Sequence, residues 1–230
     1  AHAADGEFHA AIMPHHTNAG WTDPDIPIDS SGSVQFATVR GCRLGLTKER
    51  AMPAAKTLNG PIEFIVDRVP TPIGLALVAV DADERLRAFD WADYEERLLR
   101  LMDRYYGAGN VTLTPGRLPT AIRAALDAYF EGDLDALAGL PVRTGGTEFQ
   151  REVWAALRTI PASQTLSYGA LAARIGRPKA VRAVGLANGS NPIGLVVPCH
   201  RVIGADGSLT GYGGGIDRKR WLLAHEQAHA

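Results

Sequence analysis

Alternating hydrophobic and polar residues become clear only after residue 60, and the first elements that they predict are strands. Ile62–Val69 and Gly74–Val80 are rich in β-branched residues and flank Pro70-Thr71-Pro72, which predicts a hairpin or a meander. Arg85–Trp91 is a further candidate strand. Because helical patterns follow these strands, we expect an α+β domain over residues 61–140.

Two helices are predicted in the rest of this domain. Asp93–Tyr106 has an amphipathic pattern. Thr120–Phe130 carries one apolar stripe, formed by Ile122, Ala125, Leu126, Tyr129 and Phe130. Gly132 follows closely and is expected to end the second helix.

A linker at 141–146 leads to a second predicted domain, residues 147–230, which is expected to be helical. Thr147 and Gln150 have the spacing of a capping box, in which each side chain binds a free amide at a helix start. Further on, Ser167–Ile175 is one short helix, and a second is expected from near Pro178 to about Asn188. Two short helices joined by a tight turn are typical of a helix-turn-helix, although many packed helix pairs share this outline.

Residues 1–60 read as a poorly defined extension. Only Val34–Arg40 has the pattern of a short strand. Four histidines are irregularly spaced among small and polar residues, which favours a flexible leader over a metal site.

Composition excludes several classes of protein. The 230 residues are 46% hydrophobic with a net charge of -1, which is ordinary for a globular protein. No run approaches the ~18 consecutive apolar residues of a membrane span, and no secretory signal is evident. Cys42 and Cys199 are the two cysteines, so a disulfide framework and a four-cysteine zinc site are excluded. Cys42 has no motif around it and is interpreted as structural.

Charge is distributed unevenly along the chain. Residues 142–230 hold 11 Lys and Arg against 5 Asp and Glu, a net charge of +6. The preceding 141 residues hold 13 and 20, a net charge of -7. A basic domain suggests a polyanionic partner such as nucleic acid, although a chance imbalance between solvated faces would look the same.

Cys199 is the strongest candidate for chemistry. An apolar segment delivers it between Pro198 and His200, where most cysteines would be inert core residues. An adjacent imidazole can accept the thiol proton, and the carboxylate of Glu226, on a later helix, can orient that imidazole. Neighbouring residues in an extended segment point to opposite sides, so we expect a water between Cys199 and His200.

The motifs around this cysteine resemble those of the O6-alkylguanine-DNA alkyltransferases, which repair DNA by direct reversal. Pro198-Cys199-His200-Arg201-Val202 is similar to the active-site signature of that family. Further similarity covers Gly146–Glu226, with weaker similarity upstream. Its blocks are Gly146–Gln150, Val153-Trp154, Ile160-Pro161, Ser167–Gly169, Arg182–Gly185, Asn188–Pro192, Gly211–Gly215, Lys219–Glu226, Pro70–Gly74 and Tyr129–Gly132.

The resemblance implies a role for each residue of the reactive centre. Cys199 attacks the alkyl carbon on guanine O6 and keeps the alkyl group, in one transfer per molecule. His200 acts as a base through water, Glu226 orients it, and Asn191 ties the active-site loop to the recognition helix. O4-alkylthymine is a further candidate substrate.

The resemblance also assigns the residues that surround the substrate. The hydroxyl of Tyr168 and the backbone amide of Gly213 are placed around the flipped base, with Tyr212 beside them. Carbonyls near Cys199 and Val202 face the exocyclic amine of guanine. Position 213 often carries a larger residue in the family, so Gly213 departs from that pattern.

Double-stranded DNA carrying alkylated bases is the partner that the resemblance implies, bound through its minor groove. Extruding a nucleotide costs a few kcal/mol, and Arg182 is assigned to fill the vacated stack. Lys179, three residues earlier, is expected on the same helix face and in contact with phosphate. The remaining assigned DNA-binding residues are Ala183, Gly185 and Asn188.

The remaining expectations concern the fold of the first domain, cofactors, oligomeric state and location. The resemblance implies a ribonuclease H-like fold for the first domain and no cofactor. Some members of the family carry a structural zinc in that domain, but the ligands it needs are not evident in this sequence, so we expect no metal. We expect a monomer in the cytoplasm, or in the nucleus of a eukaryote, with no membrane contact. The alternatives are a noncatalytic lesion-binding protein, which would replace the cysteine, a helix-turn-helix regulator and a Cys–His hydrolase, for which no oxyanion-hole motif is visible.

Overall fold

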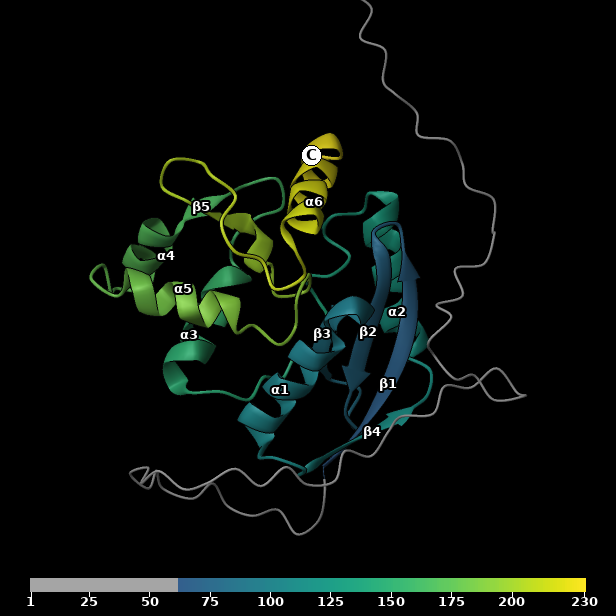
Figure 1. The fold of residues 1–230 in the computed structure, drawn as a ribbon. Helices are drawn as coiled ribbons and strands as arrows, with labels where there is room; N and C mark the ends of the chain where they lie inside the picture. The colour runs from purple at the N-terminus through teal and green to yellow at the C-terminus, as the bar shows by residue number, and fades with distance from the viewer. Residues whose placement is uncertain (1–61) are drawn as a thin grey trace, which may run out of the picture. The chain divides into compact units, whose positions relative to one another are not determined.

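A mixed four-stranded sheet forms the first half of the structure, a computed structural model that describes residues 62–230. Its strands are β1 (Ile62–Thr71), β2 (Gly74–Val80), β3 (Leu86–Trp91) and β4 (Val111–Pro115), in the order β3-β2-β1-β4 (Figure 1). β1 and β2 form the predicted hairpin, in which Thr71 pairs with Gly74. β3 extends it antiparallel, whereas β4 runs parallel to β1. The predicted strand at 34–40 and Cys42 lie outside the described residues.

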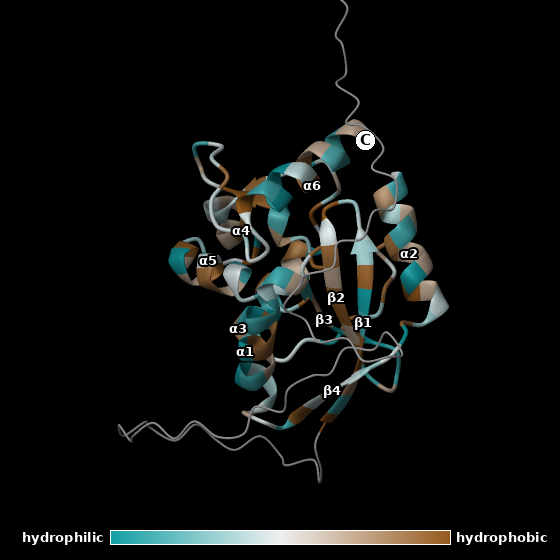
Figure 2. Cartoon of the chain, turned by 45° about the vertical axis from the view of Figure 1, so that its right-hand side comes forward, coloured by the Kyte–Doolittle hydropathy of each residue, from teal (hydrophilic) through white to brown (hydrophobic). Residues whose placement is uncertain are grey.

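Helices flank this sheet, and β2 and β3 are almost wholly buried. α1 (Glu95–Tyr106) follows a short 3-10 turn, and α2 (Thr120–Glu131) ends at Gly132, whose φ of 111° is left-handed (Figure 1). All six residues of β3 are buried, as are the last five of β2. In Figure 2 β2 is mostly hydrophobic, whereas the outer side of α2 is largely hydrophilic.

The second half is built from short helices joined by long irregular segments. α3 (Glu148–Leu157), α4 (Tyr168–Arg174) and α5 (Val181–Gly189) pack together, and α6 (Ile216–Ala228) ends the chain (Figure 1). Thr147 and Gln150 form the predicted capping box at the start of α3. β5 (Leu166–Ser167) and β6 (Val202–Ile203) are a two-residue parallel pair.

The second of the paired helices starts later than the sequence predicted. α5 begins at Val181, because Pro178 and Lys179 belong to a turn in which the Ala180 amide donates to the Arg177 carbonyl at 2.8 Å. A proline is compatible with a first helical turn, but here it serves the connection instead. Lys179 is therefore not on the helix, contrary to the prediction.

The outer edge of β3 holds the segment that leads to Cys199. The Phe89 amide donates to the Pro192 carbonyl, and the Gly194 amide donates to the Phe89 carbonyl, both at 2.9 Å. Residues 141–143 pair with the same strand, at Leu86. One hydrophobic core includes Val78 of the sheet and Val197 of this segment. The sheet therefore fixes the backbone that carries the candidate nucleophile.

Candidate active site

Cys199 opens a 3-10 turn, Cys199–Arg201, and is only 5% exposed. The sequence reasoning expected an extended backbone at this point. Its amide donates to the Val197 carbonyl at 2.8 Å, which tightens the chain just before the turn. Among residues 62–230 the structure shows no hydrogen bond between the Cys199 thiol and the imidazole of His200.

His200 and Glu226 form a fully buried pair. Nε2 of His200 lies 2.8 Å from Oε1 of Glu226. Because an ionised carboxylate only accepts hydrogen bonds, Nε2 carries the proton and Nδ1 holds the basic lone pair. Nδ1 is buried and has no hydrogen-bond partner among the described residues. Burial lowers the pKa of His200, and Glu226 opposes that shift only in part, so the imidazole is neutral and able to accept a proton.

Glu226 is held ionised by donors on several sides. It accepts hydrogen bonds from the Tyr129 hydroxyl at 2.9 Å, from the Arg201 guanidinium at 2.8 Å and from the Ser163 amide at 3.1 Å. Burial acts to raise its pKa, but the bonds from His200 and Arg201 outweigh burial and keep the pKa well below its usual range. The carboxylate is therefore fixed in position and in charge.

Two asparagines connect α5 to the nucleophile. Asn188, at the end of α5, donates to the Cys199 carbonyl at 3.4 Å. Asn191 donates to the Val197 carbonyl at 2.7 Å, and its Oδ1 accepts from the Ile193 amide at 3.0 Å. Both side chains are buried. The backbone on either side of Cys199 is thereby tied to the end of the helix.

The thiol carries its proton in the resting protein. Burial raises the pKa of Cys199, while the hydrogen bond with Asn191 and the positive charges of Arg97 and Lys219 act in the opposite direction. The thiolate is the reactive form of cysteine. The site therefore needs a base to remove this proton.

Lys219 is a fully buried cation that the sequence reasoning did not assign. Its Nζ donates to the Val202 carbonyl at 2.6 Å and to the Thr210 carbonyl at 2.7 Å. Burial lowers the pKa of Lys219. The Val202 carbonyl was predicted to accept a hydrogen bond from the exocyclic amine of guanine. A carbonyl oxygen has two lone pairs, so it can accept from Lys219 and from that amine at the same time, and this role stays a prediction.

Two tyrosines border the same region. The Tyr168 hydroxyl lies 3.5 Å from Oγ1 of Thr210, and its ring approaches Gly185 on α5. The ring of Tyr212 meets that of His200 edge to face, with centroids 6.4 Å apart. Tyr168 therefore lies beside α5, and Tyr212 lies beside the imidazole of His200.

The glycine run 211–215 fits closely against the sheet half. A Cβ on Gly214 would lie 2.2 Å from the indole of Trp91, and a Cβ on Gly213 would lie 2.4 Å from the guanidinium carbon of Arg97. Real Cβ atoms do not approach other atoms so closely, so a side chain at Gly214 would clash with the buried indole ring, and one at Gly213 would displace the Arg97 guanidinium. The loop next to Tyr212 is thus shaped by residues of β3 and α1.

The outer face of α5 is exposed and partly apolar. Arg182 and Ala183 are exposed, and Leu186 is 72% exposed. Neither Arg182 nor Lys179, in the turn before the helix, forms an ion pair within residues 62–230. This face is available to a partner.

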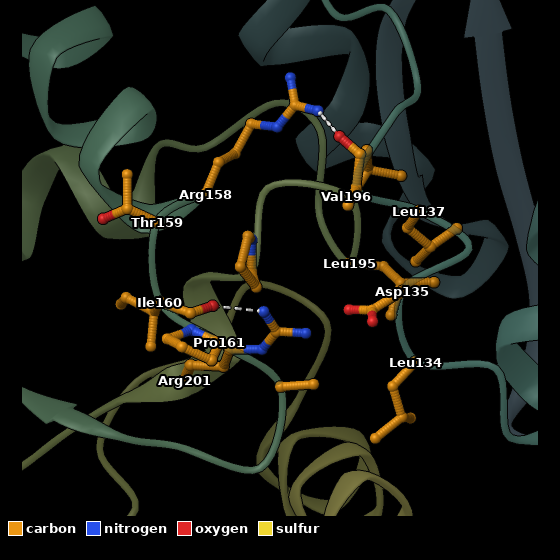
Figure 3. A pocket seen from close by; sticks show the side chains of 13 residues that line it. Leu134, Asp135, Leu137, Arg158, Thr159, Ile160, Pro161, Leu195, Val196 and Arg201 are labelled. Carbon is orange, nitrogen blue, oxygen red and sulfur yellow. Dashed lines mark hydrogen bonds between the residues drawn. The ribbon is translucent and has the colours of Figure 1, made fainter. Parts of the chain in front are cut away.

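A pocket borders the active-site segment without reaching its nucleophile (Figure 3). Leu195, Val196 and Pro198 line it together with Arg201, whose guanidinium donates to the Ile160 carbonyl at 2.6 Å. Neither Cys199 nor His200 is among its lining residues. The pocket therefore meets the charge network of Glu226 rather than the thiol.

Neither a metal-binding group nor a membrane-spanning helix is found in the described part of the chain. Residues 62–230 contain no group of His, Cys, Asp and Glu that could hold a metal ion. Within the same residues, every helix is too short or too polar to cross a membrane.

Sequence reasoning missed several residues of the site. Lys219 was detectable, because it lies three and seven residues before Leu222 and Glu226 and so shares their helix face. Arg201 stands within the quoted motif. Arg97 gave no signal, because its partners in this region lie more than 90 residues away.

Comparisons with known proteins agree on what this chain is similar to. Residues 148–228 match the profile described as "6-O-methylguanine DNA methyltransferase, DNA binding domain". The methylated-DNA–protein-cysteine methyltransferase of Shigella flexneri is 49% identical over 165 residues, which cover 72% of this chain and 96% of that protein. That of Mycolicibacterium paratuberculosis is 53% identical over 135 residues, 57% of this chain and 80% of the relative. The crystal structure of Mycobacterium tuberculosis OGT in complex with DNA matches with a TM-score of 0.59 and 41% identity, covering 74% of this chain and 95% of that one.

Proposed function

Since the chain belongs to the family of methylated-DNA–protein-cysteine methyltransferases, we propose that Cys199 is the cysteine that accepts the alkyl group. The activity is the repair of alkylation damage in DNA. The observation that carries the assignment is the buried His200–Glu226 pair, whose unpartnered Nδ1 belongs to the residue next to Cys199. A carboxylate, an oriented imidazole and a thiol form the relay that activates a nucleophile.

The proposed reaction is a single displacement. Nδ1 of His200 takes the thiol proton through a bridging water, and a sulfur lone pair forms a bond to the alkyl carbon. The bond between that carbon and guanine O6 breaks, and its electron pair stays on the base. Guanine then gains a proton at N1, which balances the proton lost by the thiol. Glu226 stabilises the imidazolium that forms in between.

We propose one transfer per molecule. The product is a thioether on Cys199, which is chemically stable. Reversal would need a second nucleophile aimed at the same carbon, and among the described residues no other cysteine is present. The protein is therefore consumed by its reaction.

The region around Tyr168 and Gly213 is proposed to hold the base. Negative charge develops on O6 as the bond breaks, so hydrogen-bond donors must face that oxygen. The Gly213 amide and the Tyr168 hydroxyl are the proposed donors, with Tyr212 and the Val202 carbonyl nearby. The fixed glycine loop supports this role, because preorganised donors need no rearrangement during the reaction.

We propose that α4 and α5 act as a helix-turn-helix in the minor groove of double-stranded DNA. Exposure of Arg182 and Leu186 supports this, since minor-groove proteins place arginines in the groove and insert apolar side chains such as leucine between base steps. Arg182 would fill the stack left by the extruded nucleotide, and Lys179 would contact phosphate from the turn. Ala183 and Gly185 remain predictions as DNA-binding residues. Asn188 is only 3% exposed and its amide donates to the Cys199 carbonyl, so its proposed role is to hold the active-site backbone rather than to contact DNA.

The detailed fold, the domain boundary, the oligomeric state and the location are also proposals. They are the ribonuclease H-like fold of the sheet half, the boundary at 141–146, a monomeric state, and a location in the cytoplasm, or in the nucleus of a eukaryote. A noncatalytic lesion-binding protein or a regulator would need no relay, so the buried His200–Glu226 pair favours transfer.

A duplex carrying a radiolabelled methyl group on guanine O6 tests this proposal. With DNA in excess, we expect transfer to stop at one methyl per protein molecule, and Cys199→Ser to transfer none. Cys42→Ser is the matched control and should transfer as the parent does. Continued turnover, or undiminished transfer by Cys199→Ser, would overturn the assignment.

A further inference from the structure

Arg97, on α1 in the sheet half, reaches the backbone that carries the site. Its guanidinium donates to the Gly189 carbonyl at 2.9 Å and to the Asn191 carbonyl at 3.2 Å. These two residues bracket the end of α5 and begin the segment that leads to Cys199. A planar guanidinium with several donors is suited to such fixed, multiple contacts.

Asp90, on β3, holds this guanidinium in place. Its carboxylate pairs with Nη1 of Arg97 and also accepts from the Trp91 amide at 3.0 Å. Asp90 is only 3% exposed, and a buried carboxylate is costly unless it is paired. The arginine is thus anchored to the sheet and aimed at the other half of the protein.

The glycine loop is the third contact of Arg97. The guanidinium fills the space that a side chain at Gly213 would occupy. One cation therefore contacts both the turn at Asn191 and the loop at Gly213, whose amide is proposed to face the substrate oxygen. Within residues 62–230, Arg97 is the charged side chain that donates a hydrogen bond to the Asn191 carbonyl.

We propose that Arg97 is a positioning residue for alkyl transfer: anchored by Asp90, it fixes the Asn191 turn and the Gly213 loop around Cys199, and its charge stabilises the thiolate. The inference rests on the proposed function of Cys199, and it means that the sheet half contributes two residues, Arg97 and Asp90, to the active site.

The charges around Cys199 support an electrostatic part in this role. Arg97 and Lys219 act to lower the pKa of Cys199, and Asp90 acts to raise it. His200 is neutral at rest, and the Tyr212 phenol is kept protonated because burial raises its pKa. Arg97 does not lose its proton in proteins, whereas burial lowers the pKa of Lys219. Of these two cations that act on Cys199, Arg97 is therefore the one whose charge is permanent.

The test measures the rate of reaction with free O6-benzylguanine from acid to alkaline pH, in a Cys42→Ser background. Arg97→Gln keeps hydrogen-bond donors but removes the charge, and Arg97→Lys keeps the charge. Arg218→Gln is the matched control, since Arg218 also bridges the halves, through the Ile73 and Gly214 carbonyls at 2.9 and 3.0 Å, whereas the cations that act to lower the pKa of Cys199 are Arg97 and Lys219.

We expect Arg97→Gln to move the rising limb of the profile to higher pH by about one unit, which is about tenfold in rate at neutral pH. Arg97→Lys should restore most of this shift, and Arg218→Gln should leave the limb in place while lowering the melting temperature. A purely structural role would slow Arg97→Gln equally at every pH, or leave its rate unchanged, and either result overturns the inference. Failure of the unmodified protein to react at all would instead refute the proposed function.

Discussion

Each half of the protein contains a buried carboxylate that several donors hold ionised, Asp81 in the sheet half and Glu226 in the other, and these two carboxylates have different surroundings. Asp81, at the turn between β2 and β3, is 8% exposed and accepts from Arg87 at 2.7 Å and from Arg85 at 2.9 Å. Glu226, on α6, is fully buried and accepts from Arg201, but also from His200. Arginines and backbone amides are the donors to Asp81. The difference is the imidazole, which binds the carboxylate with one nitrogen, while its other nitrogen has no hydrogen-bond partner in the part of the chain that the structure describes.

The carboxylates of Asp81 and Glu226 are kept ionised in the same way but have different roles. Burial raises the pKa of each carboxyl, and hydrogen bonds to arginine and other donors reverse that shift in both cases. In the sheet half the result is a pinned turn, in which the Arg85 amide also donates to Asp81 at 2.9 Å. In the other half the same ionised state orients a base. A buried charge network thus indicates catalysis only where it contains a group able to exchange a proton.

Removing the negative charge of Glu226 or of Asp81 should produce the largest difference: the first change should slow alkyl transfer, and the second should lower stability. Glu226→Gln is expected to slow methyl transfer by about 100-fold, because the imidazole loses its orienting carboxylate. Asp81→Asn should lower the free energy of unfolding by about 2 kcal/mol, because charged hydrogen bonds to arginine are weakened, and leave the transfer rate unchanged. Single-turnover kinetics on a methylated duplex and urea unfolding measure the two effects. Equal slowing of methyl transfer by both substitutions would contradict the claim that Glu226, and not Asp81, serves catalysis.

Exposed arginines of the two halves give a second contrast. Arg182→Ala, on α5, should slow repair of duplex DNA by about tenfold, or ~1.4 kcal/mol, because the vacated stack is left unfilled. Its reaction with free O6-benzylguanine should be unaffected. Arg100→Ala, on the exposed face of α1, is the matched control and should change neither rate. Equal losses of Arg182→Ala on both substrates would remove its role in base extrusion.

Acid should destabilise the two networks over different ranges of pH. The pKa of His200 lies below its ordinary value of 6.5 in the folded protein. The unfolded chain therefore binds a proton that the folded protein does not, so stability falls as the pH drops below this value. Asp81 and Glu226 have lowered pKa values, so their contributions are lost only at more acid pH.

Between pH 7 and 5 we expect the folded protein to lose about 1 kcal/mol through His200. The loss should disappear in His200→Asn and persist in Asp81→Asn, when unfolding free energies are measured at both pH values. A parent-like slope in His200→Asn would mean that the imidazole is not buried in its neutral form.

Much of the secondary structure was predictable, because local patterns determine it. The hairpin, the stripe of α2 and the capping box of α3 all involve residues close in sequence. β4 was missed, since five residues ending in a proline at a sheet edge give little periodicity. The start of α5 was misplaced because a proline fits both a first helical turn and the connection before it.

The reactive centre was predictable where it is contiguous or carries a family motif. Cys199 and His200 are neighbours, and Glu226 was found through the resemblance and its helix position. Arg97 and Asp90 were missed, because tertiary packing alone brings them to the site. The 3-10 turn at Cys199 was also missed, since a run of apolar residues cannot distinguish an extended strand from a tight turn.

Locating the transferred methyl group tests the central claim most directly. The protein is reacted with a duplex containing O6-methylguanine labelled with a heavy methyl group, digested, and its peptides are weighed by mass spectrometry. The account predicts one heavy methyl group, on the peptide that contains Cys199, and none on the peptide that contains Cys42. A methyl group on any other residue, or an unmodified Cys199 after the lesion has been removed, would contradict it.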